Sequence, residues 1–319
     1  MSGKKRLFWF WAVLFLSGCL KEAPPPAFLV GTNIWPGYEC LYLAKGLGYY
    51  EGTPIKLVQY PSSSAVIRAF RNNFIQGAAL TMDEVLLLAD LNQDPKVISI
   101  LDFSSGGDVV LAKPQFETMN SLKGKRIGVE TAALGAFVLS RALETAGMKL
   151  SDLEIIRLEP NEHERAFSAG SVDAVVTFDP MRGRLLKAGA RVLFDSSQIP
   201  GEIVDVLVTR ADVGVLHASA VESLLRGWFR ALDYLRKNPE EAARRMAPRE
   251  GITPEELLDS LRLLKIPDLR ENISFMTGKD PAFHQGIERL EKILLDGKLI
   301  KKTMPPRQLI DPSLLGRIQ

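Results

Sequence analysis

Short apolar segments of strand type alternate twice along the chain with longer segments of helical spacing. In the first round, Val66, Ala69 and Phe70 show the i, i+3, i+4 spacing of a helix. Strands are expected at 28–35, 54–60, 77–80 and 96–103, and helices at 39–48, 62–74 and 82–91. This β-α-β-α-β order predicts an α/β lobe with a mainly parallel sheet.

The same rhythm starts again at residue 126. Strands are expected at 126–130, 153–159, 174–178 and 191–194, and helices at 134–146, 162–169 and 181–188. After about residue 215 the pattern is helical throughout, at 217–237, 239–246, 254–264 and 281–295. The sequence has no fixed-period repeat, which argues against a solenoid.

Two segments, near 102–114 and 204–212, are predicted to connect the two α/β units. A pair of crossings predicts a hinge. We therefore expect a first lobe of residues 28–113 plus 206–319, which includes the C-terminal helices, and a second lobe of residues 114–205.

The first nineteen residues have the order of an export signal. Lys4, Lys5 and Arg6 precede an apolar run of ten residues, and a membrane-spanning helix needs about 20. The following Leu16-Ser17-Gly18-Cys19 resembles the lipobox of bacterial lipoproteins. That resemblance implies cleavage of a signal peptide 1–18, lipidation of Cys19, a tether at 19–27 and a lipid-anchored location on the periplasmic side of the cell envelope. The alternative is an ordinary secretory signal with a chance cysteine.

Composition narrows the choice of partners. Loss of residues 1–18 removes three basic residues and no acidic one, so the formal charge changes from +2 to about −1. No strongly basic half suggests nucleic acid. The three histidines are scattered and no Cys/His spacing suggests a metal, so we expect neither metal nor cofactor. With Cys19 lipidated, Cys40 has no internal disulfide partner and is expected to pack as a small apolar residue.

In open α/β sheets, ligands bind at the carboxyl ends of the strands, where helix N-termini offer free N–H groups. The loop after the first strand places Trp35 and Tyr38 on either side of a Pro-Gly turn, so the two rings either form a ligand wall or cover the sheet edge. The other candidates in such loops either cap helices or bind ligand: Ser62, Ser63, Ser64, Thr81, Asp83 and Thr131.

These loops are rich in carboxylates and contain no lysine or arginine. The acidic residues in or beside them are Glu39, Asp83, Asp102, Glu130 and Asp179, and Glu202 and Asp205 lie near the second crossing. A bare oxyanion can bind helix N-termini without arginine, but so many carboxylates oppose it. We therefore hypothesise a ligand with an amine or a protonated heterocycle, stacked on Trp35; nitrate and sulfonates are not excluded.

The order of several motifs resembles solute-binding proteins of the nitrate/sulfonate/taurine ABC-transporter family, which includes binders of thiamin-precursor pyrimidines. The motifs are Asn33-Ile34-Trp35-Pro36-Gly37-Tyr38-Glu39, residues 41–50, residues 68–81, residues 122–129 and Gly170-Ser171-Val172-Asp173-Ala174-Val175. The resemblance covers residues 28 to about 240.

This resemblance implies a type II periplasmic-binding-protein fold in the α/β class, with two lobes, a two-crossing hinge and no catalysis. It also implies a monomer that captures a small organic solute between its lobes and works with an ABC permease and ATPase. The ligand contacts it implies are Asn33, Trp35, Gly37, Tyr38, Ser62, Ser63, Ser64, Thr81, Thr131, Ala132, Leu134, Phe178 and Asp179.

Two other functions stay open at this point. The same binding cleft could report its ligand to a membrane kinase or cyclase. An enzyme related to pyrimidine synthesis shares the fold, but the chain has neither a cysteine-rich run nor a histidine in the cleft loops.

Overall fold

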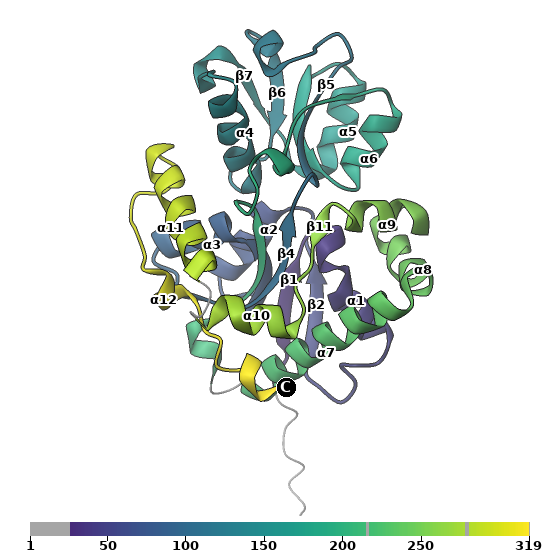
Figure 1. Cartoon of the computed structure of the whole chain (residues 1–319), viewed down its shortest axis with the longest axis vertical. Coiled ribbons are helices and arrows are strands. Elements are labelled where there is room, and N and C mark those ends of the chain that lie inside the picture. Colours follow the sequence, from purple (N-terminus) through teal and green to yellow (C-terminus); the bar gives the residue numbers. More distant parts are fainter. Residues whose placement is uncertain (1–25, 215–216, 278–280, 319) are drawn as a thin grey trace, which may run out of the picture.

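A computed structural model describes residues 26–214, 217–277 and 281–318, and they form two lobes, each built on its own sheet (Figure 1). The expected signal peptide, the lipidated Cys19 and residues 20–25 of the tether lie outside the described residues. None of the described helices combines the length and the apolar character that a bilayer-spanning helix needs.

The sheet of the first lobe has six strands in the order β11-β4-β10-β3-β1-β2. Their bounds are β1 Phe28–Thr32, β2 Ile55–Gln59, β3 Gly77–Thr81, β4 Pro95–Ser104, β10 Val204–Arg210 and β11 Leu264–Lys265. All five residues of β3 are buried, as expected for a strand covered by helices on both faces.

The sheet of the second lobe has five strands in the order β7-β6-β8-β5-β9. Their bounds are β5 Asp108–Ala112, β6 Arg126–Val129, β7 Glu154–Arg157, β8 Ala174–Phe178 and β9 Arg191–Asp195. Alternate residues of β5 face opposite sides: Val110 joins the core that contains Phe137, while Val109 joins the core that contains Phe167.

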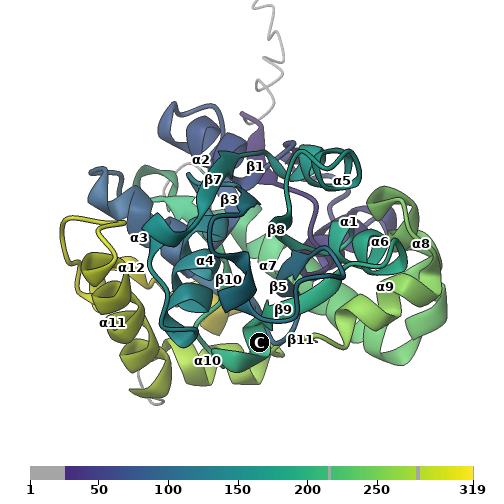
Figure 2. The same ribbon diagram turned by 90° about the horizontal axis from the view of Figure 1, so that it is seen from above.

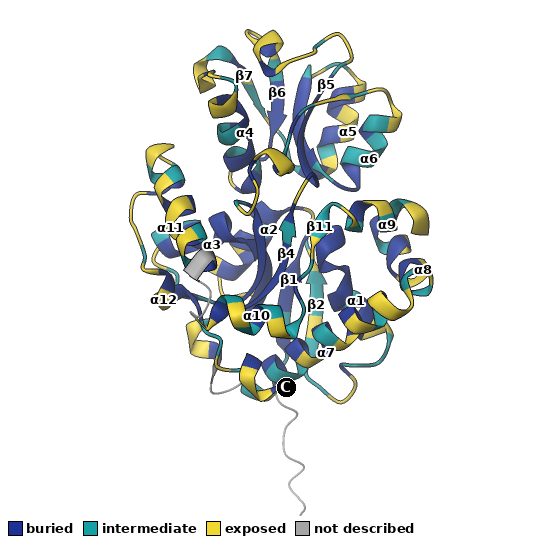
Figure 3. Cartoon of the chain, viewed as in Figure 1, coloured by how far each residue is buried: buried dark blue, intermediate teal, exposed yellow. Residues whose placement is uncertain are grey.

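Helices cover both sheets, as the two views of Figures 1 and 2 show. In the second lobe they are α4 Leu134–Thr145, α5 Pro160–Ser168 and α6 Met181–Lys187. In the first lobe they are α1 Glu39–Gly46, α2 Ser63–Arg71, α3 Met82–Asp90, α7 Ala218–Lys237, α8 Pro239–Glu250, α9 Pro254–Leu261, α10 Leu269–Met276, α11 Pro281–Asp296 and α12 Pro306–Leu309. Figure 3 shows the buried residues concentrated in the strands and on the inner faces of these helices.

The expectation of a mainly parallel sheet holds for strand direction, because β1, β2, β3 and β4 run the same way in the first lobe and β6, β7, β8 and β9 do so in the second. The pairs β1–β2, β1–β3, β6–β7 and β6–β8 are parallel, whereas β10 runs antiparallel to β3 and β4, and β5 runs antiparallel to β8 and β9. The strands that follow the crossings, β5 and β10, enter their new sheets in the opposite direction. Both sheets are therefore mixed.

The two connecting segments are largely strand. The segment 102–114 contains the end of β4 and all of β5, and the segment 204–212 contains β10. Because β5 pairs inside the second sheet, the first crossing lies at residues 105–107, before the boundary expected after residue 113.

Hydrogen bonds join the two crossings to each other. The Ser196 hydroxyl accepts from the Gly106 N–H at 2.7 Å and lies 2.9 Å from the Ser104 hydroxyl. The Ser104 N–H donates to the Ile203 carbonyl at 3.1 Å. The chain thus passes between the lobes along two segments that are bonded side by side.

Candidate functional site

The carboxyl ends of β1, β3 and β4 in the first lobe face those of β6 and β8 in the second. Trp35 follows β1, and its ring lies edge-on to Phe178 at the end of β8, with ring centroids 5.8 Å apart. Trp35 is buried in this junction. Gly107, in the first crossing, leaves room for it, since a Cβ there would lie 2.8 Å from Trp35 Cη2.

The turn after β1 places both of its aromatic rings on buried aspartates. Pro36 begins a short 3₁₀ turn in which the Tyr38 N–H donates to the Trp35 carbonyl at 2.9 Å. The Trp35 indole N–H donates to Asp102 Oδ2 at 3.2 Å, and the Tyr38 hydroxyl donates to Asp205 Oδ1 at 2.5 Å. Gly37 permits this approach, because a Cβ there would lie 1.9 Å from Asp102 Oδ2.

Asp102 and Asp205 lie opposite each other on the neighbouring strands β4 and β10. Burial, reinforced by the charge of Asp108, raises the pKa of Asp102, and burial followed by the charge of Asp102 raises the pKa of Asp205 well above its usual range. Burial also raises the pKa of Asp108 to about 7. Two such carboxyls side by side favour a shared proton over two charges.

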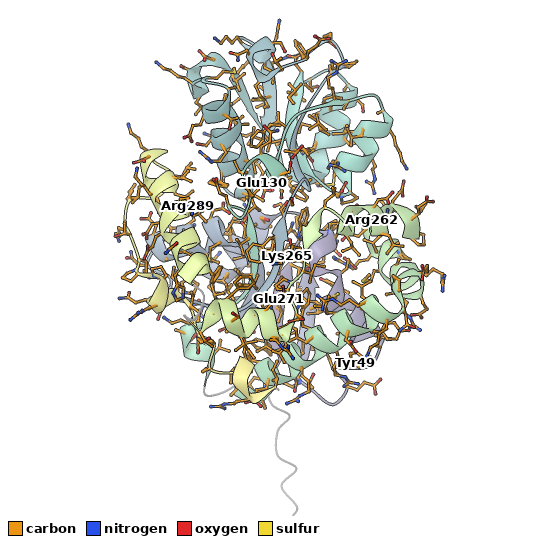
Figure 4. All side chains as sticks on the ribbon, viewed as in Figure 1. Tyr49, Glu130, Arg262, Lys265, Glu271 and Arg289 are labelled. Carbon is orange, nitrogen blue, oxygen red and sulfur yellow. The ribbon has the colours of Figure 1, made fainter. Side chains whose placement is uncertain are left out.

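Two glutamates cross the cleft in opposite directions. Glu130, after β6 of the second lobe, accepts from the Ser64 N–H at the start of α2, at 2.7 Å. Glu84, in α3 of the first lobe, accepts from the Leu134 N–H at the start of α4, at 3.2 Å. Figure 4 labels Glu130 at the junction of the lobes.

Asp83 and Asp179 complete a set of seven buried cleft carboxylates. The set, called the cleft carboxylates below, is Asp83, Glu84, Asp102, Asp108, Glu130, Asp179 and Asp205. Burial is the first cause that raises the pKa of each member. Across the described residues, the ion pair found for this set joins Arg182 to Asp179 at 3.6 Å. The cleft is therefore acidic and short of cations.

Several buried oxygens of the cleft have no hydrogen-bond partner among the described residues. They include Asn33 Oδ1, Asp102 Oδ1 and Asp108 Oδ2. Buried acceptors of this kind are costly unless a donor reaches them. No group of three or more His, Cys, Asp or Glu side chains in the described part of the chain has a geometry that could hold a metal ion. The cleft thus presents several buried hydrogen-bond acceptors.

Most of the sequence-predicted site residues converge on this junction. The buried ones are Asn33, Trp35, Gly37, Tyr38, Ser62, Ser63, Ser64, Thr81, Asp83, Leu134 and Asp179, with Phe178 half-buried. Thr131 and Ala132 are exposed and lie on the rim. Ser62 caps α2 by accepting from the Ala65 N–H at 3.2 Å.

Two acidic residues named with the cleft loops are held in ion pairs away from the cleft carboxylates, and Glu202 lies in the second crossing as expected. Glu39 pairs with Arg249, whose Nε donates to Oε1 at 2.6 Å, and Glu202 pairs with Arg141 at 2.7 Å. Sequence reasoning missed Glu84 and Asp108. Glu84 lies in the capping box of α3, a local feature of a helix start, and Asp108 lies in the segment 102–114 that was interpreted as a connection.

Two pockets flank the closed centre of the junction. One, of about 400 Å³, lies between α2, α3 and α4 and is lined by Ser64, Arg68, Asp83, Glu84 and Thr131, among others. The other, of about 300 Å³, lies between α6 and α9, with Asp179, Arg182 and Ser260 in its lining. Both pockets have residues of the two lobes in their walls.

A family model described as "NMT1/THI5 like" matches residues 35–242. A putative binding protein of Brucella abortus is 29% identical over 139 residues, which cover 42% of this chain and 44% of the relative. The taurine-binding periplasmic protein of Escherichia coli is 24% identical over 193 residues, which cover 60% of each chain. The chain thus spans less than two thirds of the length of these curated relatives.

Solved structures match over a larger share of the chain. The alkanesulfonate-binding protein SsuA of Xanthomonas axonopodis, bound to MOPS, has a TM-score of 0.75 at 18% identity and covers 91% of this chain and 99% of its own. The desulfurization enzyme DSZB has a TM-score of 0.68 at 16% identity and covers 91% and 98%. At these identities the likeness shows the fold alone. The predicted fold, two α/β lobes joined by two crossings with a helical C-terminal region, is confirmed.

Proposed function

The chain belongs to the NMT1/THI5-like family, and from this membership we propose that it is a periplasmic solute-binding protein of an ABC importer. Curated relatives that carry the names of binding proteins support this proposal. So does a junction between two lobes that collects buried, conformationally fixed side chains from both. Within this proposal the protein is a receptor and not an enzyme, and its partners are a permease and an ATPase.

We propose that the ligand carries a protonated amine or a protonated heterocycle. The observation that carries this proposal is the set of cleft carboxylates, with Arg182 as its ion-pair partner among the described residues. A buried carboxylate is stabilised by a cation that also donates hydrogen bonds, and Asp108 Oδ2 has no hydrogen-bond partner among the described residues. Taurine, named for one relative, itself combines an amine with a sulfonate.

Trp35 supplies the apolar side of the proposed site. Its indole is held by Asp102 and meets Phe178 of the opposite lobe. Aromatic faces attract cations and stack on planar heterocycles, so one ring serves both kinds of ligand.

The proposed mechanism is closure of the two lobes around the ligand. We place the first lobe at residues 28–104 plus 204–318 and the second at 108–195, with crossings at 105–107 and 196–203. A ligand that touches both lobes stabilises the closed form, and only a difference in affinity between open and closed forms shifts the population. Small-angle scattering on ligand addition checks this step, and an unchanged radius at saturation would reject it.

Calorimetry with matched probes tests the ligand class. Protonated alkylamines and aminopyrimidines are expected to bind, while methanesulfonate and nitrate are not. Binding of methanesulfonate with no response to any amine would overturn the amine proposal. Mass spectrometry of solutes released from protein purified from its native host then identifies the compound.

The membrane anchor is a separate proposal that depends on Cys19. Triacylation at this residue would hold the receptor at a membrane, since each buried methylene contributes about 0.8 kcal/mol. A Cys19→Ser variant is expected to lose the acyl mass and to leave the membrane fraction. A variant that stays in the membrane fraction would show that another segment anchors the chain.

A further inference from the structure

We infer that Glu84 and Glu130 determine specificity at the helix N-termini of the cleft, because an oxyanionic solute must displace a carboxylate to reach the N–H groups of Ser64 and Leu134. Each glutamate bonds to the first turn of a helix in the opposite lobe. This inference rests on the proposed binding function and adds how the site rejects a class of solute.

Each of the two glutamates bonds to a helix of the other's lobe. Glu130 belongs to the second lobe and binds the Ser64 N–H in the first turn of α2, a helix of nine residues in the first lobe. Glu84 belongs to the first lobe and binds the Leu134 N–H at the start of α4, a helix of twelve residues in the second lobe. The first turn of a helix is where backbone N–H groups and the helix dipole attract anions.

Glu84 caps two helices at once. Its Oε2 accepts from the Thr81 N–H of its own helix α3 at 3.0 Å, while Oε1 accepts from Leu134. Two carboxylates therefore each accept from the N-terminal ends of the cleft helices, with one N–H bonded at each of α2, α3 and α4. Both glutamates are buried, so an incoming anion would have to displace a side chain that is already hydrogen-bonded.

The loop that carries Glu130 is held close to α4. Gly135, in the first turn of α4, lets this loop approach the helix, because a Cβ at Gly135 would lie 2.8 Å from the Glu130 carbonyl oxygen. Glu130 therefore sits at a fixed place beside the helix start while its side chain reaches across to α2. The fixed loop makes the carboxylate a built component of the site.

Space for an anion exists beside these carboxylates. The pocket of about 400 Å³ between α2, α3 and α4 is lined by Ser64, Glu84 and Ala133, and it also includes Arg68 and Arg71 of α2. Removal of a carboxylate would open an N-terminus onto this pocket, where the two arginines add positive charge. The positive electrostatic potential at the exposed helix N-terminus would then favour an anion.

The experiment compares methanesulfonate binding by calorimetry in the parent protein, Glu130→Ala, Glu84→Ala and Glu144→Ala. Glu144 is the matched control, because it lies at the far end of α4 in an exposed ion pair with Arg141. The expected result is a gain of at least about tenfold in affinity for Glu130→Ala, with no gain for Glu144→Ala. Sulfate serves as a second probe.

Two results would overturn the inference. One is a parent protein that binds methanesulfonate as tightly as Glu130→Ala does. The other is a Glu130→Ala variant with a native circular-dichroism spectrum and no gain in affinity. If Glu84→Ala unfolds because α3 loses its cap, Glu130→Ala still decides the question. Amine binding is measured separately on the parent protein. If no amine binds, the proposed ligand class is rejected, but the comparison of methanesulfonate affinity between the parent and Glu130→Ala still stands.

Discussion

Trp35 and Phe178 meet edge to face at 5.8 Å, and they belong to different lobes. Trp35 is also one of two tryptophans among the described residues, the other being Trp228 in the core of the first lobe. The environment of a single indole therefore depends on whether the lobes are together.

A Trp228→Phe variant leaves Trp35 as the only tryptophan of the mature chain expected from cleavage before Cys19. We expect its emission to shift when a ligand is added, because separation from Phe178 or stacking on a ligand changes the surroundings of the indole. The Trp35→Ala variant should lose at least about tenfold in ligand affinity, and Trp35→Phe should lose less. Fluorescence titration measures the first effect and calorimetry the second; equal affinity of Trp35→Ala and the parent would exclude stacking.

The cleft carboxylates predict that the ligand-free protein loses stability as the pH rises. Burial raises the pKa of Asp108 to about 7, above the ordinary aspartate value near 4, so the folded state binds more protons than the unfolded state between these values. Stability is therefore full below about pH 4 and declines up to about pH 7. We expect a melting temperature about 5 °C lower at pH 8 than at pH 5, measured by calorimetry.

The Asp108→Asn variant is the control for this pH dependence. It cannot ionise at this position, so its melting temperature should fall less between pH 5 and pH 8 than that of the parent. If the melting temperatures of the parent and the variant fall by the same amount between pH 5 and pH 8, the pH dependence belongs to other groups.

Affinity for a cationic ligand should follow the opposite trend. A cation binds the ionised carboxylates, so its affinity should rise from pH 5 to pH 8 while the free protein becomes less stable. We expect Asp102→Asn to lower this affinity by at least about tenfold, since it removes one charge from the wall next to Trp35. Asp94→Asn, an exposed aspartate in an ion pair with Lys96, should leave it unchanged. Calorimetry at three pH values measures both effects.

Gly37 and Gly46 form a matched pair for the turn after β1. A Cβ at Gly37 would lie 1.9 Å from Asp102 Oδ2 and 2.4 Å from Trp35 Nε1, whereas a Cβ at Gly46 meets nothing within 4 Å. We expect Gly37→Ala to cost about 1–3 kcal/mol and to abolish binding. Gly46→Ala, at the end of α1, should be neutral or stabilising by up to about 1 kcal/mol. Chemical denaturation and calorimetry measure these differences, and equal stabilities would mean that the turn moves freely.

The alternation of strands and helices could be predicted from the sequence because it depends on local apolar spacing. The strand at residues 174–178 and the helix starts at Met82, Leu134 and Met181 agree with the structure. The reversed direction of β5 and β10 could not be predicted in the same way. The antiparallel pairing of β5 and β10 depends on where the chain crosses between lobes, which no local pattern of residues records.

The candidate site was predictable where a residue follows a strand directly. Trp35, Asp83 and Asp179 reach the junction for this reason. Glu84 was missed because its cross-lobe bond to Leu134 joins residues 50 positions apart, while its local spacing indicates only a cap. Thr131 and Ala132, expected as ligand contacts, are exposed and line the pocket between α2, α3 and α4.

The bonds of Ser196 to Ser104 and Gly106 limit how one lobe can travel relative to the other. Because the two crossings are hydrogen-bonded to each other, we expect them to bend together in the proposed closure of the lobes, which restricts sliding of one crossing along the other.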